Sequence, residues 1–436
     1  MNNLIIEGGH PLIGEVNLSG SLNSALKLIP AALFSSEDVL LENVPKVASV
    51  ESDLQVLRSL GAKAEWLANS QILINGSTLR SYEIPYDIGS KYRTVGLLAA
   101  PLLYRFGQAV IPKSTGRPIN RWIDTWKQLG IEYYEDARFM YLKSGRPAAG
   151  DVHFKTSTHT GTDNAILTAI ALPRETVISN ASQASEVDDL IAFCNKMGAE
   201  VKRTDSRSIK IAGKNIFNGA KFKVQNDITE AIMFAAAAII TKGNIRILGV
   251  DKTTLTAFTN VLAKINCHFE FLNNEFRVWY GGDDMNPVNI NTSPAPGFLT
   301  DWKPYLVLML GKAVGDSLVH DTVFVDRFDF LKDLNRMGAN IDLFKPSEAG
   351  LTPVISDDNY DYEKLGEPST VTKVHGPVQL KAARLYIDNL KSGAVLILAA
   401  LSAAGKSEIG GYKIIETGFD NILGKLSGLG AKIYVD

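Results

Sequence analysis

A short signature recurs six times along the chain, and it limits the possible folds more than any other feature. An apolar helical pattern ends in Leu-Gly-Ala or a close variant, and an alternating stretch broken by turn residues follows, as in a hairpin. The landmark positions are Gly61, Gly130, Gly198, Asn266, Gly338 and Gly430. Their spacings, by subtraction, are 69, 68, 68, 72 and 92 residues. These intervals predict a sixfold repeat, with a surface insertion at the polar, acidic residues 356–367 lengthening the last one.

Each repeat also contains a helical pattern that is apolar on nearly all sides. These patterns cover residues 25–33, 95–103, 165–172, 232–240, 305–310 and 394–401. A helix without a polar face has to be buried, so the hairpins and the amphipathic helices are expected to surround these helices. A chain of 436 residues favours two domains, which gives three repeats to each.

Composition narrows the class of protein and of partner. The hydrophobic share of 45% and the charged share of 21% are typical of a folded, soluble chain. A net charge of -2 offers no general field to nucleic acid or to an anionic membrane, so small-molecule partners are expected. The longest apolar runs fall short of the roughly 20 residues that span a bilayer, and the N-terminus does not resemble a secretion signal. We therefore expect a cytoplasmic protein.

The sequence predicts neither a metal site nor a cofactor site. Its two cysteines, Cys194 and Cys267, lie in apolar sequence without metal-ligand spacing, as packed free thiols in a reducing compartment would. The six histidines are scattered, and no P-loop or dinucleotide fingerprint is present.

Polar residues precede each of the six apolar helices. They are Ser21 and Asn23; Lys91 and Arg93; Thr160, Thr162 and Asp163; Asp227 and Glu230; Asp301; and Asp388, Asn389 and Lys391. A helix start exposes unpaired N–H groups and a partial positive charge. If the helices of each domain start at one end, two facing domains would form an anion-binding cleft. For any single residue, ordinary capping is the alternative.

One segment is locally basic. Residues 91–127 contain seven Lys or Arg residues against one acid, Asp124. Within it, the loop 111–120 (IPKSTGRPIN) combines two cations with two hydroxyls. Such a loop suits a phosphate, because Arg binds oxygens in a bidentate manner. A solvated loop with incidental charges is the alternative.

Several stretches resemble the enolpyruvyl transferase family, above all its members that act on UDP-N-acetylglucosamine. They are residues 14–26 (GEVNLSGSLNSAL), 41–46 (LENVPK), 298–301 (FLTD), 321–328 (DTVFVDRF) and 335–339 (NRMGA). The resemblance extends over essentially the whole chain. It implies an α/β fold, a two-domain inside-out barrel of six βαβαββ-type repeats. It also implies that residues 1–21 join 226–436 in one domain, and that 22–225 form the other.

The resemblance also implies a reaction. Enzymes of this family add phosphoenolpyruvate to an acceptor hydroxyl through a tetrahedral intermediate and expel phosphate, which requires cations, an acid and a base. The implied catalytic residues are Asp301, as the base, with Arg117 and Lys391 as cations. The implied substrate-binding residues are Asn23, Arg93, Pro118, Ile119, Asn120, Thr160, Gly161, Asp227 and Val323.

Several positions depart from the family pattern, mostly on the phosphoenolpyruvate side. Leu22 replaces a Lys, Thr417 and Lys391 replace Arg residues, and residues 113–116 lack the usual acidic Cys or Asp. In the acceptor pocket, Leu97 replaces a Trp and Asn120 an Asp.

Three readings remain open, and the first of them, a transferase, is favoured. The first is a diverged enolpyruvyl transferase acting on UDP-N-acetylglucosamine or a related nucleotide. The second is an inactive relative that binds a nucleotide or nucleotide sugar. The third is a different reaction on a phosphorylated ligand, with Asp301 or Asp227 as the base.

Overall fold

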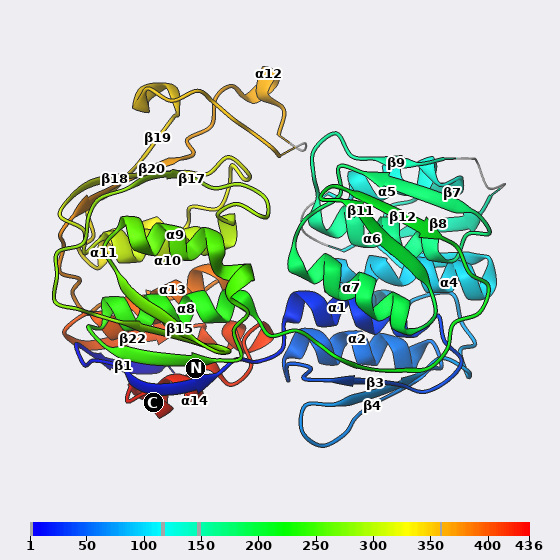
Figure 1. Cartoon of the computed structure of the whole chain (residues 1–436), viewed down its shortest axis with the longest axis horizontal. Helices are drawn as coiled ribbons and strands as arrows, with labels where there is room; N and C mark the ends of the chain where they lie inside the picture. Colours follow the sequence, from blue (N-terminus) through cyan, green and yellow to red (C-terminus); the bar gives the residue numbers. More distant parts are fainter. Residues whose placement is uncertain (1–2, 115–117, 146–149, 358–359) are drawn as a thin grey trace. The chain divides into compact units, whose positions relative to one another are not determined.

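The computed structural model describes residues 3–114, 118–145, 150–357 and 360–436. The chain divides into two compact units (Figure 1). Unit 1 comprises Met1–Ser19 and Asn226–Asp436, and unit 2 comprises Gly20–Gln225.

Unit 1 contains three four-stranded sheets among its described residues, with strand orders β21-β22-β1-β23, β15-β16-β14-β2 and β17-β18-β20-β19. The first comprises β1 (Leu4–Gly8), β21 (Arg384–Tyr386), β22 (Gly405–Gly410) and β23 (Lys432–Val435). The second comprises β2 (Ile13–Asn17), β14 (Asn244–Leu248), β15 (His268–Leu272) and β16 (Glu275–Trp279). The third comprises β17 (Asn289–Asn291), β18 (Gly315–His320), β19 (Ile341–Phe344) and β20 (Val371–Gly376). In each sheet one edge strand is parallel to its neighbour, and the other pairs are antiparallel.

Unit 2 repeats this plan with one exception. The sheet β13-β3-β5-β4 comprises β3 (Val39–Glu42), β4 (Lys63–Trp66), β5 (Ile72–Asn75) and β13 (Ala220–Lys223). The sheet β11-β12-β10-β9 comprises β9 (Val152–His153), β10 (Glu175–Ser179), β11 (Glu200–Asp205) and β12 (Ser208–Ala212). The sheet β6-β8-β7 has three strands, β6 (Gln108–Pro112), β7 (Ile131–Glu135) and β8 (Phe139–Ser144). In place of its parallel edge strand, Glu83 forms a single parallel bridge to Val110.

Buried helices occupy the centre of each unit, and this confirms the prediction from the apolar patterns. In unit 1, α8 (Ile228–Ile240), α10 (Lys303–Leu310) and α13 (Leu390–Ser402) pack against one another. In unit 2 the buried helices are α1 (Leu22–Ala32), η1 (Arg93–Leu98) continuing into α4 (Ala99–Phe106), and α6 (His159–Ile170). Helices with one buried face are α2 (Ala48–Ser59), α5 (Asn120–Gln128), α7 (Ser185–Lys196), α9 (Thr256–Lys264), α11 (Phe330–Arg336) and α14 (Ile422–Gly428).

The predicted helix over 95–103 differs in detail from the structure. Its first part, η1, is a 3-10 helix, and the α-helix begins only at Ala99. Pro101 lacks the N–H that an α-helix would direct to the carbonyl of Leu97, so one hydrogen bond of a continuous α-helix is lost at this turn. Arg93 lies at the start of the 3-10 helix.

The remaining helices are short. They are α3 (Tyr86–Gly89), α12 (Tyr362–Leu365), η2 (Lys252–Leu255), η3 (Thr300–Trp302), η4 (Ser347–Ala349) and η5 (Tyr412–Thr417). The predicted insertion over 356–367 contains α12 and lies between β19 and β20. Among the described residues, every helix is too short or too polar to cross a bilayer.

Candidate active site

In unit 1 the structure brings Asp301 and Lys391 together. Asp301 lies in η3, immediately before α10, and Lys391 lies in the first turn of α13. The carboxylate oxygen Oδ1 of Asp301 accepts hydrogen bonds from both Lys391 Nζ and Arg327 Nη1. The guanidinium of Arg327 also lies over the ring of Phe324, 3.6 Å from its centroid. The predicted base is therefore held between two cations.

Arg327 is a candidate site residue that the sequence reasoning did not select. It stands within the stretch 321–328 that carries the family resemblance, and this was the available signal. Its partner Asp301 is 26 positions away in sequence, so their ion pair depends on how the loop after β18 folds back onto η3.

A buried ion pair fixes that loop. Lys303 Nζ donates to Asp321 Oδ2 at 2.7 Å and to the carbonyl of Arg327 at 2.9 Å. Thr300 Oγ1 donates to the same carboxylate at 2.6 Å, and the backbone N of Val323 donates to Oδ1 at 3.0 Å. Burial lowers the pKa of Lys303 to about 8, although the charge of Asp321 opposes that shift. The pair remains charged at neutral pH and holds η3 and the 321–327 loop in register.

Asp227 lies at the same end of the buried helices. It caps α8, where its Oδ1 accepts from the backbone N of Thr229 at 2.8 Å and of Glu230 at 3.1 Å. Burial, followed by the charges of Asp227 and Asp301, raises the pKa of Tyr305 in α10. Both carboxylates therefore influence the pKa of the same buried tyrosine, which is consistent with their position at one end of the buried helices.

In unit 2 the predicted residues Arg93, Thr160 and Gly161 meet at the start of α6. Arg93 Nη2 donates to Thr160 Oγ1 at 2.9 Å. The N–H of Gly161 is directed at the hydroxyl of Thr158, the N-cap of the helix. The guanidinium of Arg93 lies 5.3 Å from the ring centroid of Trp122.

The other predicted residues of unit 2 lie at the starts of α1 and α5. Asn23 is exposed in the first turn of α1 and hydrogen-bonds with Glu186 of α7. Pro118, Ile119 and Asn120 lead into α5, which also carries Trp122. Arg117 lies outside the described residues.

Three of the positions that depart from the family pattern, Leu22, Leu97 and Thr417, are uncharged residues. Leu22 is the half-buried first residue of α1, and Leu97 is buried in η1. Thr417 ends η5, and its hydroxyl donates to the carbonyl of Ile414 at 2.6 Å. Burial raises the pKa of the Cys194 and Cys267 thiols to about 12, which does not suit either for the missing acid.

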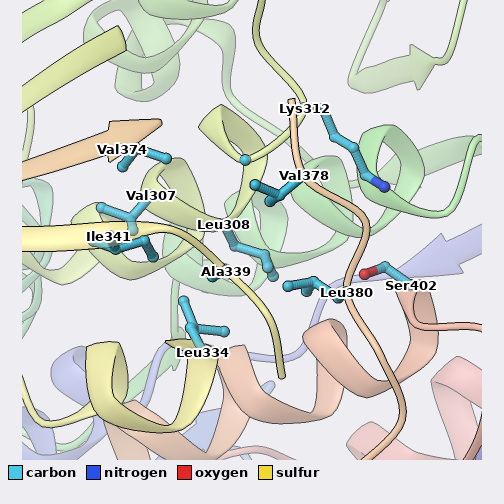
Figure 2. A pocket seen from close by; sticks show the side chains of 11 residues that line it. Val307, Leu308, Lys312, Leu334, Ala339, Ile341, Val374, Val378, Leu380 and Ser402 are labelled. Atoms are coloured by element: carbon cyan, nitrogen blue, oxygen red, sulfur yellow. The ribbon is translucent and has the colours of Figure 1, made fainter. Parts of the chain in front are cut away.

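The apolar pocket in Figure 2 lies away from these groups. It has an empty volume of about 340 Å³, open solvent included, at the C-terminal end of α10, whereas Asp301 precedes the N-terminal end. Its lining is mainly aliphatic: Val307, Leu308, Leu334, Ile341, Val374, Val378 and Leu380 contribute to it. It offers little to a phosphorylated ligand.

Comparison with known proteins identifies the family. A model of the EPSP synthase (3-phosphoshikimate 1-carboxyvinyltransferase) family matches residues 6–426. The chain belongs to this enolpyruvyl transferase family. The predicted family and the prediction of a transferase are therefore confirmed. Two similar proteins are the UDP-N-acetylglucosamine 1-carboxyvinyltransferase of Idiomarina loihiensis, 31% identical over 99% of both chains, and UDP-N-acetylglucosamine 1-carboxyvinyltransferase 2 of Bacillus subtilis. The latter is 30% identical over 100% of this chain and 96% of its own.

Solved structures of enolpyruvyl transferases share the fold. The enolpyruvyl transferase NikO from Streptomyces tendae superposes with a TM-score of 0.87 at 20% identity, over 100% of this chain and 98% of its own. EPSP synthase from Acinetobacter baumannii superposes with a TM-score of 0.73 at 14% identity, over the whole of both chains. These likenesses confirm a mixed α/β fold.

Proposed function

We propose that this enolpyruvyl transferase moves the enolpyruvyl group of phosphoenolpyruvate to a hydroxyl of UDP-N-acetylglucosamine or a related nucleotide. The names of the relatives at about 30% identity support the choice of substrates. The observation that carries the proposal is the position of Asp301, which is bound by Arg327 and Lys391 at the start of α10.

The two cations explain how Asp301 becomes a base. In the free protein they neutralise its carboxylate, which makes it a poor proton acceptor. The anionic groups of phosphoenolpyruvate offer Arg327 and Lys391 stronger partners. Asp301 then accepts the proton of the acceptor hydroxyl while the hydroxyl oxygen bonds to C2 of phosphoenolpyruvate. In the same step, C3 takes a proton from an acid. Loss of that proton and cleavage of the C2–O bond release phosphate and restore the double bond.

The same proposal assigns the remaining residues. Asn23, Arg93, Thr160 and Gly161 bind the nucleotide sugar, with Pro118, Ile119 and Asn120 on its uridine side. Asp227 belongs to the polar lining, Val323 lies near the sugar, and Arg117 is a further catalytic cation beside Lys391 and Arg327. The shared plan of the sheets supports a sixfold repeat in an inside-out arrangement, with domains 22–225 and 1–21 plus 226–436.

A second candidate is a nucleotide-binding relative without turnover. Leu22 and Thr417 favour it, because neither can hold a phosphate where the family has cations. Each lost cation would cost roughly 2 to 4 kcal/mol of transition-state stabilisation. An inactive relative would retain the unit 2 contacts and bind nucleotide alone.

One experiment separates the two candidates. The purified protein is titrated calorimetrically with UDP-N-acetylglucosamine, UMP and phosphoenolpyruvate, singly and in pairs, while phosphate release is followed. Release that requires both a nucleotide and phosphoenolpyruvate supports the transferase. Nucleotide binding without release supports the binding protein, and no binding of any ligand contradicts both.

Asp301→Asn tests the base directly. We expect kcat to fall by roughly 10²- to 10⁴-fold, the usual contribution of a general base, with little change in nucleotide affinity. Asp284→Asn, at an exposed position of unit 1, is the matched control and is expected to leave kcat unchanged. Unchanged turnover in Asp301→Asn contradicts the assignment.

A further inference from the structure

The apolar pocket of unit 1 lies at the opposite end of two buried helices from the candidate active site. Val307 and Leu308 belong to the C-terminal part of α10, and Ser402 is the last residue of α13. Asp301 precedes α10, and Lys391 lies in the first turn of α13. Since α13 has 13 residues, it is roughly 20 Å long. The pocket is therefore separate from the proposed catalytic groups.

The walls of the pocket are aliphatic and mostly buried. Leu334 of α11, Ile341 of β19 and Val374 of β20 are 1%, 7% and 1% exposed. Among the described residues, neither an aromatic ring nor a carboxylate lines the pocket. An aliphatic chain would gain apolar contacts here without burying an unpaired polar group.

The polar side chains of the lining stand together at one side. Figure 2 shows Lys312 and Ser402 on one side of the pocket, with Val307, Ile341 and Val374 on the other. The hydroxyl of Ser402 already donates to a backbone carbonyl of α13, at 3.1 Å. Lys312 therefore remains as the donor for the polar end of a ligand whose apolar part fills the rest.

Lys312 indicates the charge of that polar end. The side chain is half-buried, and within the part of the chain that the structure describes its Nζ has neither a hydrogen bond nor an ion pair. Burial lowers the pKa of Lys312, and the charge of Lys242 lowers it further. A ligand anion would oppose both effects, because an opposite charge stabilises the ammonium.

The position at the end of α10 narrows the choice of anion. The C-terminal end of a helix carries a partial negative charge. It disfavours a dianionic phosphate more than a monoanionic carboxylate. One lysine, without a second cation in the lining, also matches a single negative charge.

We propose that this pocket binds an aliphatic monocarboxylate, with its chain against α10, α11 and β20 and its carboxylate paired with Lys312 Nζ. The empty volume of about 340 Å³, open solvent included, restricts the ligand to a short or medium chain. The proposal does not depend on the transferase reaction, and binding is measured without turnover.

A chain-length series tests the apolar part. Hexanoate, octanoate, decanoate and dodecanoate are titrated near neutral pH by ligand-observed NMR. We expect each added methylene to raise the affinity roughly fourfold until the pocket is full, after which the affinity stops rising. Absence of binding would show a packing defect in place of a site. A rise that continues unchanged to dodecanoate would show adsorption to the surface, and either result overturns the proposal.

A neutral counterpart tests the carboxylate. Octan-1-ol has the chain of octanoate without its charge, and we expect it to bind roughly tenfold more weakly, since it lacks a charge-assisted contact. Lys312→Met keeps an apolar stem and removes the ammonium. It should weaken octanoate to the level of octanol and leave octanol unchanged. Lys252→Met, at an exposed position of the same unit, is the matched control. Octanoate binding at wild-type strength in Lys312→Met contradicts the proposal.

Two further measurements locate the ligand. Ala339→Leu places a larger side chain in the pocket and should abolish the binding of both octanoate and octanol, with thermal melting to check the fold. Saturating phosphoenolpyruvate and UDP-N-acetylglucosamine should leave octanoate bound. Displacement by either would show that octanoate binds at Arg327 and Lys391, and full binding by a folded Ala339→Leu would place it outside the pocket. Both outcomes contradict the proposal.

Discussion

Each unit contains a buried pair of Lys and Asp near its proposed site, and the two pairs differ in how completely they are bonded. In unit 1, Asp321 accepts from Lys303 Nζ at 2.7 Å, from Thr300 at 2.6 Å and from Thr292 at 2.8 Å. In unit 2, Asp163 lies 3.1 Å from Lys27, and neither of its oxygens accepts a hydrogen bond.

The difference separates an ion pair whose carboxylate is fully hydrogen-bonded from one whose carboxylate accepts no hydrogen bond. A buried pair with all its acceptors filled is costly to disturb, and it holds the backbone that positions Asp301. The carboxylate of Asp163 is held by charge alone, with Lys27 Nζ at 3.1 Å and the ring of His159 at 3.9 Å. We therefore expect the unit 1 pair to contribute more to stability than the unit 2 pair.

The largest effect is expected from breaking the filled pair. Asp321→Asn leaves Lys303 buried beside an amide and removes the acceptor shared by η3 and the 321–327 loop. We expect the free energy of unfolding to fall by about 3 to 5 kcal/mol, as for other buried pairs that lose one partner. Urea unfolding measures it, with exposed Asp284→Asn as the control. A loss below about 1 kcal/mol would show that the network does not hold this region.

Asp163→Asn should cost less. Glu186 remains near Lys27 and His159, so the lysine keeps a compensating charge, and no hydrogen bond to the Asp163 carboxylate is lost. We expect a loss of about 2 kcal/mol, below the range for a fully bonded pair. The same urea series compares the two variants, and a loss equal to that of Asp321→Asn would remove the distinction between the pairs.

The sequence predicted the buried helices and several site residues, but not the residues that these site residues contact. The buried helices followed from apolar patterns, because burial on all sides leaves a local signature. Asp163 was selected as a polar residue before such a helix, and Asp301 and Lys391 as site residues.

The partners were missed because they come from distant segments. Lys27 stands in an apolar helix 132 positions from His159, and Glu186 follows on α7. Nothing local to Lys27 indicates which helix faces it. His159 was counted among scattered histidines for the same reason. Arg327 likewise could be recognised as a site residue only from the structure, in which its loop returns to Asp301.

Asp53 has even fewer partners than Asp163, because burial is the only cause of its pKa shift and no cation contributes to it. Asp53 of α2 is buried, neither of its oxygens has a hydrogen-bond partner, and burial raises its pKa to about 8. The folded state therefore holds a proton that the unfolded state releases near pH 4, so stability falls as the pH rises from about 4 to 8. Relative to Asp53→Asn, the wild type should lose about 2 kcal/mol between pH 5 and 7, measured by urea unfolding. Parallel pH curves for the two proteins would show that this carboxyl is ionised or solvated.

Lys303 gives a slope of the opposite sign, over a narrower pH range. Its pKa is about 8 in the folded protein and near 10.5 when unfolded, so between these values the unfolded chain binds more protons and stability rises with pH. Relative to Lys303→Met, the wild type should gain about 1 kcal/mol per pH unit around pH 9. The difference between the two unfolding series removes the contributions of the other titrating groups. A flat difference would mean that Asp321 holds the lysine fully charged through this range. Lys303 would then stay protonated to a higher pH than its burial indicates. The two buried pairs would differ even more in how strongly the carboxylate is bonded.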